Sequence, residues 1–208
     1  LPVEGQRLPE EPKKLVFGSY GEKETFFRLK GELEAVFAGL RMKKASYAAE
    51  KNNPSYHPGR CASIWFDGVE VGVMGQVHPL VAKNYGIDTE VYCAELNLTK
   101  MFDLRLPEPT FAPLPKYPAV SRDLALVCDE ALTVAQVEEA ITAAAGKLLR
   151  KIQLFDIYRG VGIPEGKKSM AFSLELRADD RTLTDSDSEK VVADVLAALK
   201  ETLNATLR

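Results

Sequence analysis

"KKSMAFSLELRADDRTLTDSD", residues 167–187, decides the fold of the second half of this 208-residue chain. Residues 169–177 of this stretch alternate between apolar side chains and small or polar ones, which is the pattern of a strand with one buried face. The apolar positions are Met170, Phe172, Leu174 and Leu176. The residues that follow are rich in acids and precede a long apolar repeat. The stretch therefore predicts a strand, a turn and the beginning of a helix.

The acids in DSDSE, residues 185–189, have two interpretations. A calcium loop needs glycine at its sixth position and an acid at its twelfth. Counted from Asp185, these positions hold Lys190 and Leu196, which do not fit. Alternatively, Thr184 caps the helix and the carboxylates occupy its first turn, where the positive end of the helix dipole favours them. Capping needs no ligand, and we favour it.

Further predicted strands and a second helix surround this strand and helix in the second half of the chain. Thr133 and Gln136 have the spacing of a capping box, and the helix that they begin ends at Gly146. The predicted strands cover 122–129, 148–158, 169–177 and the closing segment ATLR at 205–208. The order β-α-β-β-α-β is the ferredoxin-like plan, in which two helices cover one face of the sheet and the other face is open.

The first half of the chain also predicts an α+β unit. Apolar residues recur at helical spacing from Glu24 to Leu40. Strands are expected at 44–49, 61–66, 69–77 and 91–96, and a short helix at 78–86. Asp67–Gly68 is a hairpin signal between two of these strands, so we expect a mostly antiparallel sheet.

A proline-rich stretch separates the two halves. The sequence RLPEPTFAPLPKYP, residues 105–118, contains five prolines, which exclude a helix or a central strand. An extended linker is the simplest interpretation. We therefore predict a first domain at 1–104, a linker at 105–118 and a ferredoxin-like domain at 119–208.

The composition is that of a soluble globular protein without general affinity for polyanions. Hydrophobic residues make up 46% and charged residues 27%, and the net charge is −3 with a pI near 5.6. No apolar run approaches the roughly 20 residues of a membrane-spanning helix. The first residues do not form a signal peptide and do not begin with Met, so we expect a piece of a longer chain. Three scattered cysteines without a CxxC motif indicate reduced thiols and a cytoplasmic location.

Motifs of catalysis and of metal binding are absent or weak. The sequence contains no GxSxG elbow, no P-loop and no GxGxxG fingerprint. His57, His78, Cys61 and Cys93 could form a metal site, but no pair has the usual ligand spacing. Structural roles near turns explain the histidines better. We therefore expect no catalytic residue and no metal ligand in this chain.

The open face of the predicted second sheet is the better candidate for a functional site. We expect Phe155 and Ile157 to belong to the core, which turns the residues between and after them outward. The expected outward side chains are Asp156, Tyr158, Ser169 and Ala171. A ring, a carboxylate and a hydroxyl on one surface can stack on one base and form hydrogen bonds with another. The alternative is a tyrosine that only packs on the sheet.

Basic residues gather near this surface. Between residues 147 and 168, six cations stand against two acids, so the segment carries +4 within a chain of −3. These cations are Lys147, Arg150, Lys151, Arg159, Lys167 and Lys168. Such a segment can hold a few phosphates, although the charge by itself is better explained by a solvated hairpin.

Several stretches resemble a known family. "YPAVSRDLALV", "LFDIYRG", "GKKSMAFSLELRADDRTLTD" and the ending "LNATLR" are similar to the ferredoxin-fold anticodon-binding domain at the C-terminus of bacterial phenylalanyl-tRNA synthetase β subunits. "NPSYHPGRCASIWFDGVEVGVMGQVHPLVAKNYGI" followed by "YCAELNL" resembles the preceding region, a degenerate copy of the class II synthetase core. The resemblance extends from about Leu8 to Arg208.

The resemblance implies roles for residues of the open face. It implies that Tyr158 stacks on an anticodon base and that Asp156 and Ser169 contact bases, with Ala171 beside them. Arg159, Lys167 and Lys168 are the implied phosphate contacts.

The resemblance also implies a parent enzyme and its partners. The enzyme is an aminoacyl-tRNA synthetase, a cytoplasmic ligase of protein biosynthesis that attaches phenylalanine to tRNA(Phe) with ATP and magnesium. The implied assembly contains two α and two β subunits, and the α subunit holds the catalytic centre. This chain would then bind RNA without catalysing the reaction itself and without a cofactor of its own.

Two other functions share the predicted fold, because a fold alone does not determine a function. One is a regulatory module that binds a small molecule such as an amino acid. The other is an acylphosphatase-like enzyme, which needs a phosphate-binding loop after the first strand of the domain. The corresponding turn is CDEALT, which is acidic and lacks glycine.

Overall fold

The computed structural model describes residue 9 and residues 11–208. Its contacts divide the chain into two units, and the boundary in the sequence falls between Thr110 and Phe111. This division falls within the proline-rich stretch, where residues 105–119 form neither helix nor strand. Residues 1–8 and 10 of the predicted first domain lie outside the described residues, and the boundaries 104 and 118 stay a prediction.

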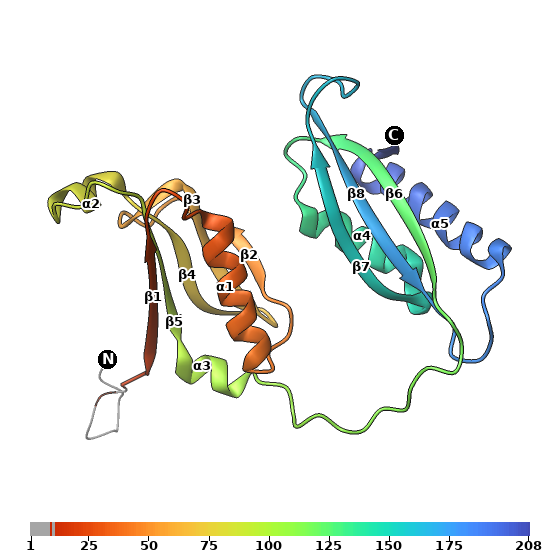
Figure 1. Ribbon diagram of the computed structural model, residues 1–208, viewed down its shortest axis with the longest axis horizontal. Coiled ribbons are helices and arrows are strands. Elements are labelled where there is room, and N and C mark those ends of the chain that lie inside the picture. The colour runs from red at the N-terminus through yellow and green to blue at the C-terminus, as the bar shows by residue number, and fades with distance from the viewer. Residues whose placement is uncertain (1–8, 10) are drawn as a thin grey trace. The chain divides into compact units, whose positions relative to one another are not determined.

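The first unit is a five-stranded antiparallel sheet with helix α1 on one face (Figure 1). The strand order is β1-β5-β4-β3-β2. The strands are β1 (Lys14–Tyr20), β2 (Ser46–Ala49), β3 (Tyr56–Phe66), β4 (Val69–Val77) and β5 (Val91–Asn97). Helix α1 (Phe26–Gly39) buries Leu29, Leu33 and Phe37 against this sheet, as its apolar repeat predicts.

Two elements of the first unit were not predicted, and both lack a strong periodic signal. β1 is an edge strand, so only one neighbour, β5, pairs with it. Helix α3 (Leu98–Asp103) has six residues, too few for a helical repeat to stand out. The predicted turn at Asp67–Gly68 does form, with φ of 49° and 79°. The predicted short helix is α2 (Pro79–Asn84).

The second unit has the predicted β-α-β-β-α-β order. Its strands are β6 (Val120–Asp129), β7 (Leu149–Tyr158), β8 (Lys167–Leu176) and β9 (Thr206–Leu207). They form one antiparallel sheet in the order β7-β8-β6-β9. Helix α4 (Val134–Ala145), the short 3-10 turn η1 (Gly146–Leu148) and helix α5 (Asp185–Leu203) connect them. The two helices cover one face of the sheet and leave the other uncovered (Figure 1).

The acid-rich stretch of the second unit is a helix cap. The Asp187 N–H donates to the Thr184 hydroxyl at 3.2 Å, and the Thr184 N–H donates to the Asp187 carboxylate at 3.0 Å. This reciprocal capping box begins α5, and a second one at Thr133 and Gln136 begins α4. The capping interpretation of the sequence is therefore confirmed for both helices.

Candidate nucleic-acid interface

The strand pairing defines which side chains share the uncovered face of the second sheet. Tyr158 of β7 lies opposite Ser169 of β8, and Asp156 lies opposite Ala171. The alternate residues of β8 are the fully buried Met170 and Phe172, which face the helices. Since neighbours along a strand point to opposite faces, Asp156, Tyr158 and their partners on β8 lie on the uncovered side.

A β-bulge in β7 changes the predicted position of Phe155. Leu154 pairs with Phe172 and Asp156 pairs with Ala171, so Phe155 is the extra residue between them. Its side chain is 57% exposed. The prediction that Phe155 belongs to the core is therefore wrong, because simple alternation cannot anticipate an inserted residue. Leu154 packs against the core in its place. The same prediction for Ile157 is also wrong, since its side chain is 38% exposed near the end of β7 and does not pack in the core.

Ser169 and Ala171, the two residues expected from β8, lie at the base of this surface and are poorly accessible. Ser169 is only 3% exposed, and Ala171 is half-buried. The outward placement of Ser169 is as expected, but its accessibility is not. Larger side chains on the neighbouring strands explain the difference, since Tyr158 stands directly opposite Ser169.

Tyr158 is held at the edge of the uncovered face by the loop after β7. Its ring is 36% exposed, and its hydroxyl donates to the Val161 carbonyl at 3.4 Å. Gly160 packs against the hydroxyl so closely that a Cβ there would lie 2.7 Å from Oη. The loop therefore positions the ring while part of its surface stays open for stacking.

Glu130, in the turn after β6, holds two of the cations that were expected to contact phosphate. The Arg159 guanidinium donates to the Glu130 carboxylate at 2.7 and 3.0 Å, and these hydrogen bonds lower the pKa of the Glu130 carboxyl. Lys168 Nζ donates to the Glu130 carbonyl at 2.9 Å and is 7% exposed. Lys168 also pairs with the buried Cys128, on the face that the helices cover. The expectation that Lys168 reaches phosphate is therefore corrected.

Lys167 is half-buried beside the end of α5. It lines a hollow of about 520 Å³ together with Asp129, Glu201 and Asn204. Two carboxylates share this hollow, so its surroundings are not those of a phosphate site. Asp156 and Tyr158 do not line this hollow.

Arg208 lies on the uncovered face, although the sequence had placed it only within a short closing strand. β9 pairs with β6 through Thr206 and Val127, and the Arg208 N–H donates to the Ala125 carbonyl at 2.8 Å. The Arg208 guanidinium lies 5.1 Å from the centre of the Tyr158 ring, a cation–π contact. The predicted topology implies that the last strand of the domain pairs with the first. The sequence of a two-residue strand does not reveal the register of this pairing, so the position of Arg208 could not be predicted.

The turn between β6 and α4 uses its own N–H groups. The Glu130 N–H donates to the Gly166 carbonyl at 2.9 Å, and the Ala131 N–H donates to Asp129 Oδ1 at 2.9 Å. The Thr133 N–H donates to Gln136 at 2.9 Å. A phosphate-binding loop needs such groups free and convergent. The arrangement argues against an acylphosphatase-like site.

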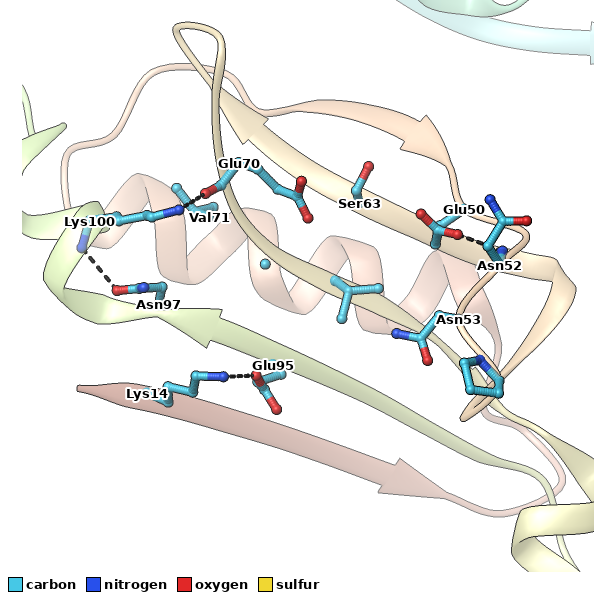
Figure 2. Close-up of a pocket in the computed structure, with 13 residues that line it drawn as sticks. Lys14, Glu50, Asn52, Asn53, Ser63, Glu70, Val71, Glu95, Asn97 and Lys100 are labelled. Atoms are coloured by element: carbon cyan, nitrogen blue, oxygen red, sulfur yellow. Dashed lines mark hydrogen bonds and ion pairs between the residues drawn. The ribbon is translucent and has the colours of Figure 1, made fainter. Parts of the chain in front are cut away.

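The first unit has a hollow of about 710 Å³ on the sheet face opposite α1 (Figure 2). Carboxylates from Glu50, Glu70 and Glu95 line it, with Lys14 and Lys100 as the cations. Lys14 pairs with Glu95, and Lys100 Nζ donates to the Glu70 carbonyl at 3.0 Å. Both cations are engaged and carboxylates are in excess, so this lining does not fit the triphosphate of a nucleotide.

The donor groups considered for a metal have local roles. His57 Nδ1 accepts from the Gly59 N–H at 3.0 Å, and His78 Nδ1 accepts from the Leu80 N–H at 3.2 Å. Among residue 9 and residues 11–208, no three His, Cys, Asp or Glu side chains gather as a metal site. Within the same part of the chain, no helix is long and apolar enough to span a membrane.

Two family models together match almost the whole chain. The model described as the phenylalanyl tRNA synthetase beta chain CLM domain matches residues 1–98. The model described as the ferredoxin-fold anticodon binding domain matches residues 115–208. The second match covers the sheet that carries Asp156, Tyr158 and Arg208.

Similar proteins bear one name. The phenylalanine–tRNA ligase beta subunit of Clostridium tetani is 43% identical over 97% of this chain and 25% of its own length. The beta subunit of Symbiobacterium thermophilum is 39% identical over the whole chain and 24% of its own length. That of Streptococcus thermophilus is 43% identical over 88% of the chain. The chain thus spans about a quarter of the length of these relatives, and it belongs to the phenylalanyl-tRNA synthetase beta chain family.

Proposed function

We propose that this chain is the part of a phenylalanine–tRNA ligase β subunit that binds the tRNA anticodon. In this proposal the ring of Tyr158 stacks on an anticodon base, and the carboxylate of Asp156 accepts hydrogen bonds from a base edge. Ser169 and Ala171 form the floor below the base. The observation that carries the proposal is the position of Asp156 and Tyr158 side by side on the uncovered sheet face of a domain whose family is named for anticodon binding.

The surface suits unpaired bases better than a duplex backbone. The accessible groups include the ring of Tyr158 and the carboxylate of Asp156, and the exposed ring of Phe155 precedes Asp156 on β7. Aromatic faces stack on any exposed base, and a carboxylate accepts from base amino groups but repels phosphate. Arg159 can meet a phosphate only after it leaves Glu130. The proposal therefore places recognition on bases, with few phosphate contacts.

The chain acts by positioning the tRNA. The ligase joins phenylalanine to tRNA(Phe) with ATP and Mg²⁺, and we assign that chemistry to the α subunit of an assembly of two α and two β chains in the cytoplasm. We assign no residue of this chain to nucleotide or metal, because the carboxylate-rich hollow of the first unit does not suit a triphosphate. Anticodon contacts orient the acceptor end toward the α subunit and so convert binding into a rate advantage.

Tyr158→Ala tests the proposal directly. A stacked base is worth about 1–3 kcal/mol, so the variant should bind tRNA(Phe) about tenfold more weakly than the original 208-residue chain in a filter-binding assay. Tyr85→Ala is the matched control, since Tyr85 is 79% exposed and lies in the first unit. Equal affinity of both variants and the original chain would remove Tyr158 from the site.

A thermal unfolding curve of each variant separates binding from folding. Tyr158 is partly exposed and its hydroxyl makes one long hydrogen bond, so its removal should leave the second unit folded. A Tyr158→Phe variant keeps the ring and loses only this hydrogen bond. It should bind tRNA(Phe) within about twofold of the original chain, since stacking depends on the ring face.

A further inference from the structure

We propose that Arg208 is a nucleotide-binding residue whose guanidinium contacts the same RNA nucleotide that stacks on Tyr158. The inference rests on the proposed RNA-binding function and adds to it a residue from the opposite edge of the sheet. It starts from the position of the guanidinium over the ring, 5.1 Å from its centre.

The placement of Arg208 follows from the strand order. β9 and β7 are the two edges of the sheet, with β6 and β8 between them. Neighbouring strands lie about 4.8 Å apart, so the backbones of Arg208 and Asp156, which share one row across the sheet, are separated by roughly 14 Å. Tyr158 lies two residues further along β7, so its backbone is slightly more distant from Arg208. Neither side chain spans this distance alone. Each must lean over the central strands for the guanidinium and the ring to meet above them.

Small residues leave room for this contact. The Arg208 N–H is bonded to the carbonyl of Ala125, which pairs with Ala171, which in turn pairs with Asp156. The row between the two edges therefore consists of alanines on β6 and β8. A long side chain at either alanine would stand where the Arg208 side chain crosses the sheet.

The chemistry of the guanidinium suits a nucleotide beside a ring. Arginine is planar, carries five N–H donors and stacks on aromatic faces while its edge remains able to donate. Arg208 is exposed, and within residues 9 and 11–208 no carboxylate forms an ion pair with it. By contrast, Arg159 and Lys168 both direct their donors at Glu130. Arg208 is therefore a cation that lies over the Tyr158 ring without a carboxylate partner among the described residues.

The acceptor is a base edge or a phosphate of that nucleotide, and the two differ in their dependence on salt. A phosphate contact releases a counterion, so its loss makes the slope of log K against log[salt] shallower by about 0.7 for single-stranded RNA. A base contact leaves the slope unchanged. It also requires the planar fork of arginine, which lysine does not provide.

Binding of tRNA(Phe) by the 208-residue chain and its variants tests the inference. Arg208→Gln should weaken binding about tenfold. Arg208→Lys should restore most of the affinity if the contact is to phosphate and little of it if the contact is to a base edge. Lys200→Gln is the matched control, since it removes one positive charge from the exposed side of α5. Binding of each chain is measured at several salt concentrations.

The outcomes distinguish this inference from the proposed function. If Tyr158→Ala loses affinity while Arg208→Gln keeps it, Arg208 is not a nucleotide contact and the RNA site stands. If neither variant loses affinity, the RNA site itself is refuted. Chemical modification of Arg208 in the unsubstituted chain tests the contact even if Arg208→Gln disrupts the pairing of β9. Bound tRNA(Phe) should protect Arg208 several-fold from an arginine-specific dicarbonyl reagent. Equal modification with and without tRNA contradicts the contact.

Discussion

At the scale of single residues, Phe155 and Phe172 lie on the paired strands β7 and β8 but have opposite environments. Phe172 is fully buried between the sheet and its helices, whereas Phe155 is the bulged residue of β7 and is mostly exposed. The bulge thereby leaves an aromatic ring exposed on the edge strand β7.

The two phenylalanines should respond differently to truncation. Phe172→Ala should lower the free energy of unfolding by about 3–5 kcal/mol, because it empties a packed core position. Phe155→Ala should change it by less than about 0.5 kcal/mol, as for most surface positions. Urea unfolding followed by circular dichroism measures both. A large loss of stability in Phe155→Ala would show that the ring packs in solution.

Asp187 should make the stability of the second unit depend on pH in a defined direction. Hydrogen bonds from the Thr184 backbone and hydroxyl, and then from Arg181, lower the pKa of the Asp187 carboxyl below its ordinary value. A lowered pKa in the folded state stabilises above the pKa of the unfolded chain, near 3.9, and this contribution is lost as the pH falls through the folded value.

Comparison with Asp187→Asn isolates this contribution. The difference in free energy of unfolding between the original chain and the variant should be largest near neutral pH and shrink below about pH 4. Urea titrations of both proteins at pH 7 and pH 3 give the two differences. A difference that stays constant between these pH values contradicts a role for the ionised carboxylate in the cap.

At the scale of elements, the sheet of the first unit depends on a close approach between β4 and β5. A Cβ at Gly72 would lie 2.1 Å from the backbone oxygen of Glu95 on β5. No side chain can be accommodated at that distance without moving a strand. Gly31, in the exposed face of α1, has no atom within 4 Å of the position of a Cβ.

Alanine at these two glycines should therefore have opposite effects. Gly31→Ala should stabilise the first unit by about 0.5–1 kcal/mol, because alanine loses less backbone entropy in a helix. Gly72→Ala should destabilise it by more than that, since β4 and β5 must separate. Thermal unfolding of both variants gives the signs. Equal stability of Gly72→Ala and the original chain would contradict the close approach.

At the scale of the whole molecule, the chain consists of two units that each have a core of their own. The segment between them contains no helix or strand, and Phe111 within it is 92% exposed. Exposed segments without backbone pairing are the usual sites of proteolytic cleavage. The prolines at 113 and 115 make it extended.

Brief digestion with chymotrypsin should therefore cut first after Phe111. The products should be two resistant pieces, and the piece from residue 112 onward should keep the circular dichroism of an α+β fold because its core is complete. Mass spectrometry identifies the cut and circular dichroism the folding state. Rapid loss of either piece after this cut would show that the units depend on each other for stability.

The sequence by itself determined the elements with strong local signals and the order in which they occur. Alternation in residues 169–177, the capping boxes at Thr133 and Thr184 and the prolines of 105–118 are local features, readable because they act within a few residues. They led to the ferredoxin-like unit and to the outward direction of Asp156 and Tyr158. The edge strand β1 was missed, since the exposed Val16 between Leu15 and Phe17 hides its alternation in the sequence.

Only the tertiary structure decided which of these residues form one surface. The bulge that exposes Phe155, the burial of Ser169 and Lys168, and the meeting of Arg208 with Tyr158 all depend on register between strands far apart in the sequence. Register is determined by the fit of whole strands and helices, and a shift of one residue turns every side chain to the other face. No local pattern contains that information, which is why the cation over the ring came from the last strand and not from the basic segment that precedes and follows Tyr158.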